Sequence, residues 1–102
     1  MAWMRLTVAT PNTGAREEAL SILDDLENTL SQTNGFILGG VFTSGDGEVG
    51  RFSLWETRED ADRASSSEHN MAQRARLHDL IEAGHIEQLA EVSGANHNIP
   101  KK

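Results

Sequence analysis

The sequence contains no cysteine and no tyrosine, and its only lysines are Lys101 and Lys102. The absence of cysteine excludes disulfides, thiolate nucleophiles and cysteine-based zinc sites. The absence of tyrosine excludes a phenolate as a catalytic base. All seven arginines lie in the body of the chain, so an arginine that points inward would be a notable feature of the folded protein.

Long apolar runs are also missing. No segment approaches the ~20 apolar residues that a transmembrane helix needs, and Met1–Arg5 lacks the apolar region of a secretory signal. Together with the lack of cysteine, these absences predict a cytoplasmic protein that has no membrane partner.

The charge and the missing motifs narrow the function further. A net charge of −7 at pH 7 argues against nucleic-acid binding, which needs a basic surface. Gly39-Gly40 is not a phosphate-binding loop, and no flavin or nicotinamide fingerprint is present. No two histidines show a ligand spacing such as His-x-x-x-His. We therefore predict no cofactor and no metal site.

A chain of 102 residues fits a single domain. We predict this domain over residues 1–94 and a loose tail over 95–102. Hydrophobic periodicity and turn residues predict the following order: strand 3–9, helix 15–31, strands 36–43 and 48–55, a helical segment 58–64, helix 68–83 and strand 86–92. This order predicts an α+β, ferredoxin-like fold whose antiparallel sheet carries helices on one face.

Alternation along the strands divides the sheet into two faces. We expect one face to be the core beneath the helices, and it carries Met4, Leu6, Val8, Phe52 and Leu54. The opposite, open face would then form a homodimer interface, since interfaces favour tryptophan and arginine; it carries Trp3, Arg5, Arg51, Ser53 and Trp55. Alternatively, its arginines pair with Glu87 or Glu91 of the last strand.

Three short motifs occur in a characteristic order. Gly35-Phe36 opens the second strand, Leu54-Trp55-Glu56-Thr57 closes the third, and Ser67-Glu68-His69-Asn70 opens the long helix. In order and spacing, over residues 3–93, the chain resembles the antibiotic biosynthesis monooxygenase-like proteins. That resemblance implies a dimeric α/β barrel in which a pocket lies between each sheet and its helices.

The resemblance also implies which chemistry to expect. The haem-degrading branch of these proteins uses an asparagine, a tryptophan and a histidine, whose places here fall at Met4 or Arg5, near Ala64 and near Arg74. Haem degradation is therefore not expected. The cofactor-free monooxygenases hold an aromatic or quinol-type substrate as its anion, which reacts directly with oxygen.

For this activity, His69 is the candidate base, and Trp55, Asn70, Arg74 and Arg51 are candidate substrate-binding residues. Each has a plainer interpretation: Trp55 as a structural side chain, and His69 as an exposed residue of the first helical turn. Asn70, Gln73 and Arg74 share a helix face with Leu77, and either border a cavity or lie in water.

Two other functional classes stay open at this point. In one, the same pocket holds a small molecule without turning it over, as in a non-catalytic or stress-related binding protein. In the other, the chain is a structural or regulatory dimer module. Fold alone does not separate these classes from an enzyme.

Overall fold

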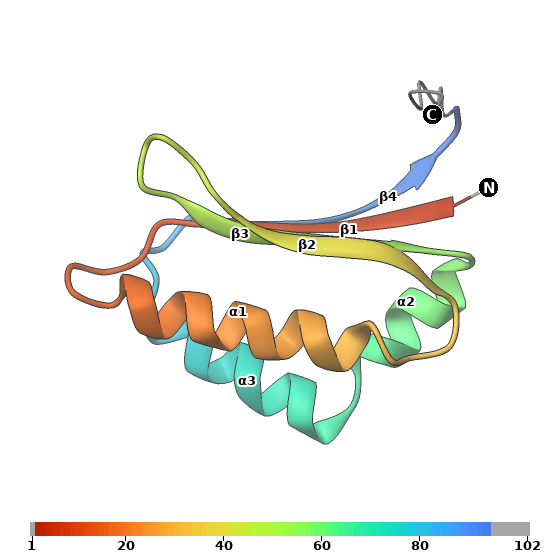
Figure 1. The fold of residues 1–102 in the computed structure, drawn as a ribbon, viewed down its shortest axis with the longest axis horizontal. Helices are drawn as coiled ribbons and strands as arrows, with labels where there is room; N and C mark the ends of the chain where they lie inside the picture. The colour runs from red at the N-terminus through yellow and green to blue at the C-terminus, as the bar shows by residue number, and fades with distance from the viewer. Residues whose placement is uncertain (1, 95–102) are drawn as a thin grey trace, which may run out of the picture.

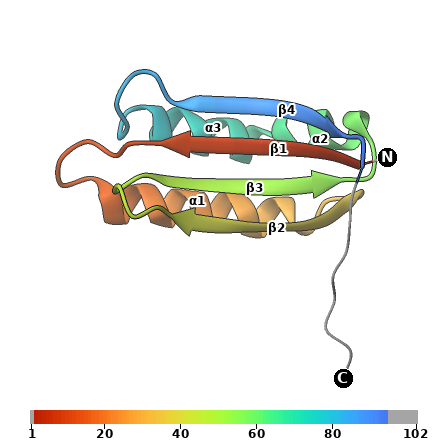
Figure 2. The ribbon, with the colours of Figure 1, turned by 90° about the horizontal axis from the view of Figure 1, so that it is seen from above.

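The computed structural model describes residues 2–94, so the predicted tail 95–102 lies outside the described part of the chain. The elements are β1 (Ala2–Ala9), α1 (Arg16–Leu30), β2 (Phe36–Thr43), β3 (Val49–Trp55), α2 (Arg58–Ser65), α3 (Glu68–His78) and β4 (Ile86–Val92). The strands form one antiparallel sheet in the order β2-β3-β1-β4, seen from above in Figure 2. This confirms the α+β, ferredoxin-like prediction.

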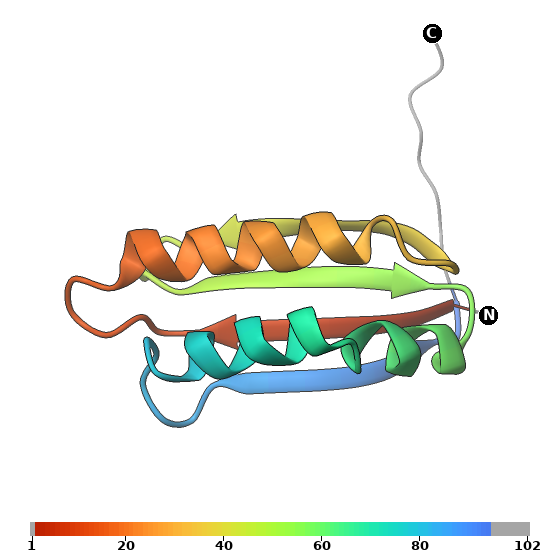
Figure 3. The ribbon, with the colours of Figure 1, turned by 90° about the horizontal axis from the view of Figure 1, so that it is seen from below.

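The helices lie in one layer on a single face of the sheet (Figure 1). Figure 3 shows α1 beneath β2 and β3, and α2 and α3 beneath β1 and β4. The apolar stripe of α1 is buried as its periodicity predicted, and it consists of Ala19, Ile22, Leu23, Leu26 and Leu30. Within residues 2–94, no helix combines the length and apolar character needed to cross a membrane.

The long helix α3 ends at His78 rather than continuing to Ala83 as predicted. The following residues leave the helix to pair with the loop after β1: Asn12 donates to the Leu80 carbonyl, and the Glu82 amide donates to the Thr10 carbonyl, each at 2.8 Å. These hydrogen bonds compete with the continuation of the helix. The sequence pattern could not reveal them, because the two segments are far apart along the chain.

The prediction of which sheet face lies beneath the helices was wrong, because the two faces are exchanged in the structure. Val49, Arg51, Ser53 and Trp55 are buried beneath the helices, and Arg51 is only 4 % exposed. Arg5 lies on this inner face as well, because it is directly opposite Ser53 in the register. The arginine-bearing face is therefore not the open face.

The open face is instead the more apolar one. It carries no charged residue and consists of Ala2, Met4, Leu6, Val8, Leu38, Gly40, Phe42, Gly50, Phe52, Leu54, Ile86, Gln88, Ala90 and Val92. The Phe42 ring lies over Gly50 and the Phe52 ring over Gly40, so each glycine leaves room for an aromatic ring on the opposite strand. The sequence prediction placed this face beneath the helices because it is the more apolar one. That step assumed that the helices of the same chain cover the more apolar face.

Candidate functional site

Charged side chains gather on the inner face of the sheet, from the buried Arg51 to the exposed Glu87. Arg51 of β3 and Glu87 of β4 lie on either side of Thr7, and Arg5 of β1 lies one row further along. Arg74 reaches this group from α3, with its Nη2 atom 3.5 Å from Glu87 Oε2. Together with Glu27 of α1, these residues form what we call the arginine cluster: Arg5, Arg51, Arg74, Glu27 and Glu87.

Arg51 is the most deeply buried member of the arginine cluster. Loss of hydration lowers the pKa of its guanidinium to about 10, and the neighbouring Arg5 and Arg74 contribute to that shift while Glu27 opposes it. The group stays cationic at neutral pH, because this value remains well above 7. A permanent positive charge is thus held beneath the helices.

Glu27 faces Arg51 from α1. Its Oε1 atom lies 3.9 Å from Arg51 Nη1, which is an ion pair but too long for a hydrogen bond. Burial raises the pKa of the Glu27 carboxyl above its usual range, although the Arg51 charge acts in the other direction. A Cβ on Gly39 would collide with this carboxylate, so the glycine in β2 makes room for it. The site therefore holds a carboxylate that takes up a proton more readily than an exposed one.

Several polar atoms of this region are buried without a hydrogen-bond partner among the described residues. They are Arg5 Nε, Arg51 Nη1, Glu27 Oε1 and Asn70 Oδ1. Such atoms are uncommon in folded proteins, because an unsatisfied buried donor or acceptor costs ~1–3 kcal/mol. Among the described residues, two cationic donors and two acceptors are therefore left without a hydrogen-bond partner.

The arginine cluster lies between two apolar groups of residues. On one side, Val49 and Ala9 pack against α1, and on the other Trp55 packs against α2 and Leu30. Across the arginine cluster, positive charge exceeds negative charge by one, since it contains three arginines and two glutamates. The arginine cluster therefore places a net positive charge between two apolar parts of the core.

Two further residues that the sequence predicted as substrate-binding, Asn70 and Trp55, are buried in the structure. Asn70 is 2 % exposed, and its Nδ2 atom donates to the Ala64 carbonyl at 2.8 Å. Trp55 is 1 % exposed, packs edge-on against Phe36, and donates from Nε1 to Ser53 Oγ at 2.8 Å. The structure thus buries Trp55, Asn70 and Arg51, and it leaves Arg74 partly exposed beside Glu87.

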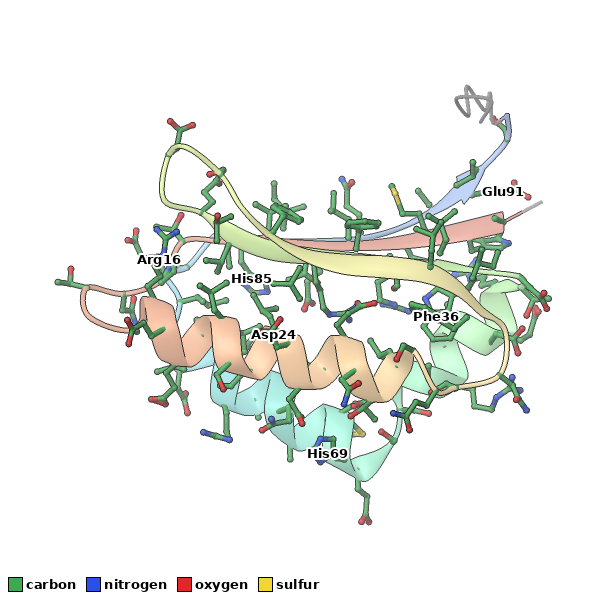
Figure 4. All side chains as sticks on the ribbon, viewed as in Figure 1. Arg16, Asp24, Phe36, His69, His85 and Glu91 are labelled. Atoms are coloured by element: carbon green, nitrogen blue, oxygen red, sulfur yellow. The ribbon has the colours of Figure 1, made fainter. Side chains whose placement is uncertain are left out.

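His69 does not join them. It lies on the side of α3 that faces away from the sheet (Figure 4), and 55 % of its side chain is exposed. Its Nε2 atom is 2.6 Å from Asp25 Oδ2, and Gln73 Nε2 donates to the same oxygen at 2.8 Å. These contacts link α1 to α3 on the outer surface. Catalysis by His69 stays a prediction from the sequence.

The Asp25 contacts predict a pH-dependent stability. Two hydrogen bonds lower the pKa of the Asp25 carboxyl below its ordinary value of 3.8, and the bond from Gln73 has a larger effect than the bond from His69. A depressed carboxyl pKa adds stability above the unfolded-state value, and this contribution is lost as the pH falls through the folded-state value. We expect the wild type to melt above Asp25→Asn at neutral pH, and this advantage to shrink as the pH falls below about 3.8 toward the lower pKa of the folded state.

Thermal melts of both proteins between pH 7 and pH 2.5 would measure this difference. Asp24→Asn is the matched control, because Asp24 is an exposed neighbour on the same helix. An advantage of the wild type that is equal at all pH values would contradict the prediction.

Sequence reasoning missed Glu27, although a signal for it was present. Glu27 stands four residues after Leu23 and three before Leu30, so it falls on the buried stripe of α1. A charged residue at such a position is unusual, because burial of an unpaired charge is costly. The sequence analysis did single out Arg51, the partner of Glu27, but placed it on the open face of the sheet instead of beneath the helices.

The comparisons with known proteins agree on the fold. No protein-family model and no curated protein matches this sequence. Among solved structures, Rv0793 from Mycobacterium tuberculosis is 20 % identical, with a TM-score of 0.83 over 94 % of this chain and 100 % of the other. SnoaB, a cofactor-independent oxygenase from Streptomyces nogalater, is 16 % identical, with a TM-score of 0.78 over 98 % of both chains.

A structure described as an antibiotic biosynthesis monooxygenase is 13 % identical, with a TM-score of 0.79 over 90 % of this chain and 99 % of the other. The resemblance seen in the sequence motifs is thereby confirmed at the level of the fold. The chain has the fold of the antibiotic biosynthesis monooxygenase-like proteins across its whole described length.

Proposed function

We propose that this protein is a cofactor-independent monooxygenase that oxidises a small aromatic or quinol-type substrate between the sheet and the helices. The observation that carries the proposal is the arginine cluster, in which the buried Arg51 faces the Glu27 carboxylate at 3.9 Å and the pKa of that carboxyl is raised. The similarity in fold to SnoaB, a cofactor-independent oxygenase, supports the same class of reaction.

Each residue has a role in this proposal. Glu27 takes a proton from an acidic C–H or phenolic O–H of the substrate, since its pKa is shifted toward the working range of a general base. Arg51 and Arg5 then donate hydrogen bonds to the substrate anion through their unpartnered N–H groups. In the proposal, Asn70 and Arg74 contact the substrate from α3 and Trp55 contacts it from β3.

The reaction balances without a cofactor. The substrate anion transfers electrons to molecular oxygen and forms a carbon–oxygen bond, giving a peroxide. Cleavage of the O–O bond leaves one oxygen atom as a carbonyl where a CH₂ group stood, and the other leaves as water. The substrate supplies all four electrons, so the protein has only to deprotonate, hold and shield the anion.

Oxygen uptake with a panel of polyphenols and quinols tests the proposal, in the absence of added flavin, haem or metal. The expected result is consumption of one oxygen molecule per substrate and incorporation of label from ¹⁸O₂ into the product. Tight binding of these compounds without oxygen uptake would instead favour the non-catalytic binding protein. Neither uptake nor binding would contradict both.

A homodimer through the open face of the sheet is part of the proposal. The support for it is the uncharged open face, where Leu38 and Ile86 are 48 % and 46 % exposed. Large uncovered apolar patches mark interfaces, because burial of apolar surface contributes ~25 cal/mol per Å². Two such faces packed together would shield each other from water.

Light scattering at micromolar concentration is expected to give the mass of two chains. Leu6→Lys places a charge on central strand β1 and is expected to yield monomers, because an unpaired charge would be buried. Met71→Lys is the control, since Met71 is an exposed apolar side chain on α3, outside the open face of the sheet. A monomeric wild type would disprove this assembly.

A further inference from the structure

Two histidines and a glutamate that are separated in sequence meet at one end of the domain. His78 is the last residue of α3, His85 follows the turn after that helix, and Glu87 is the second residue of β4. Gly84, with φ of 91°, sits directly before His85, and this left-handed conformation reverses the chain toward the sheet. The turn therefore brings His85 back beside the end of α3.

The three side chains present their ligand atoms to a common point. One nitrogen from each imidazole and one carboxylate oxygen lie within 4.8 Å of one another. His78 Nε2 is 3.9 Å from Glu87 Oε1, and His85 Nε2 is 3.9 Å from Glu87 Oε2. These separations are too long for hydrogen bonds. They are close to the ~3.4 Å between two ligand atoms that each bind a tetrahedral zinc ion at ~2.1 Å.

The two rings already lie together, with their centroids 4.7 Å apart and their planes inclined at 46°. Both rings are partly exposed, at 48 % for the His78 side chain and 25 % for that of His85, so an ion could enter from solvent. His85 lies in the layer between sheet and helices (Figure 4). It also lines a small hollow whose wall includes Glu48 and Glu82. These two glutamates add negative charge to the hollow beside His85.

We infer that His78, His85 and Glu87 form a binding site for a divalent first-row transition metal such as Zn²⁺. Two imidazole nitrogens and one carboxylate oxygen are a donor set that zinc accepts with tetrahedral geometry. Three protein ligands leave the fourth position for water or a small ligand. Arg74 lies 3.5 Å from Glu87 Oε2, the oxygen that His85 also approaches, so it orients the carboxylate and opposes a bound cation electrostatically. The inference departs from the expectation of no metal, which rested on the spacing of histidines along the chain.

Zinc titration of the full chain, without a histidine tag, tests the inference calorimetrically. One equivalent of Zn²⁺ is expected to bind per chain. His78→Ala and Glu87→Gln are each expected to weaken binding by at least ~100-fold, since even residues that only support a metal ligand contribute 10- to 100-fold. His69→Ala is the comparison, because His69 also faces a carboxylate but has no second imidazole beside it within residues 2–94. It is expected to bind zinc as the wild type does.

Nuclear magnetic resonance of the wild type tests the zinc site even if a variant does not fold. In proton–nitrogen spectra, zinc is expected to shift the imidazole resonances of His78 and His85 and to leave those of His69 in place. No binding of zinc by the wild type, undiminished binding by the folded variants, or shifts confined to other histidines would each overturn the inference.

Discussion

Replacing Glu27 by glutamine is expected to lower turnover of a quinol substrate by about 10²- to 10⁴-fold, the usual contribution of a general base. Glutamine keeps the shape of the side chain and its place beside Gly39, but cannot accept the proton. The acid limb of kcat/KM against pH, expected above the ordinary glutamate value of 4.5 because the Glu27 pKa is raised, should disappear in the variant. Oxygen uptake at several pH values measures both effects.

Two further substitutions make this experiment specific. Asp24→Asn removes an exposed carboxylate from the same helix and is expected to leave turnover unchanged. His69→Ala distinguishes the two candidate bases: a loss of 10²-fold or more would place the proton transfer at His69, as the sequence suggests. Full turnover by Glu27→Gln would refute the role of Glu27.

Replacing Trp55 by alanine is expected to reduce the free energy of unfolding by about 3–5 kcal/mol, the cost typical of removing a buried tryptophan. The side chain is 1 % exposed, its ring packs against Phe36, and its Nε1 atom donates to Ser53 Oγ. The substitution leaves a cavity between the sheet and α2, and removes the hydrogen bond of a buried hydroxyl. Urea unfolding followed by circular dichroism, at one protein concentration, measures the loss.

Trp55→Phe separates packing from hydrogen bonding. It retains most of the ring volume but not the N–H donor, so a smaller loss of about 1–2 kcal/mol is expected. If Trp55→Ala were nearly as stable as the wild type and bound substrate poorly, the residue would be a wall of the substrate pocket rather than part of the core.

Much of the fold could be read from local chemistry. The stripe of α1 and the alternation of the strands recur at the periods that helices and strands impose, so their order and most of their bounds are predictable. Thr57 accepts a hydrogen bond from the Asp60 amide as an N-cap, and Gly35 has a φ of 88° after α1, as their residue types indicate. Each of these features depends only on residues a few positions apart.

The interior was decided by contacts that local patterns do not encode. Alternation states which residues share a face but not which face the helices cover, and here the more apolar face is left open while Arg51 is buried. The meeting of Arg51 with Glu27, and of His78 with His85, depends on how helices from separate parts of the chain are laid against the sheet. The sequence by itself therefore determined the elements and their order. The tertiary structure decided which charges share the interior, because only packing brings side chains from different elements within a few ångströms of one another.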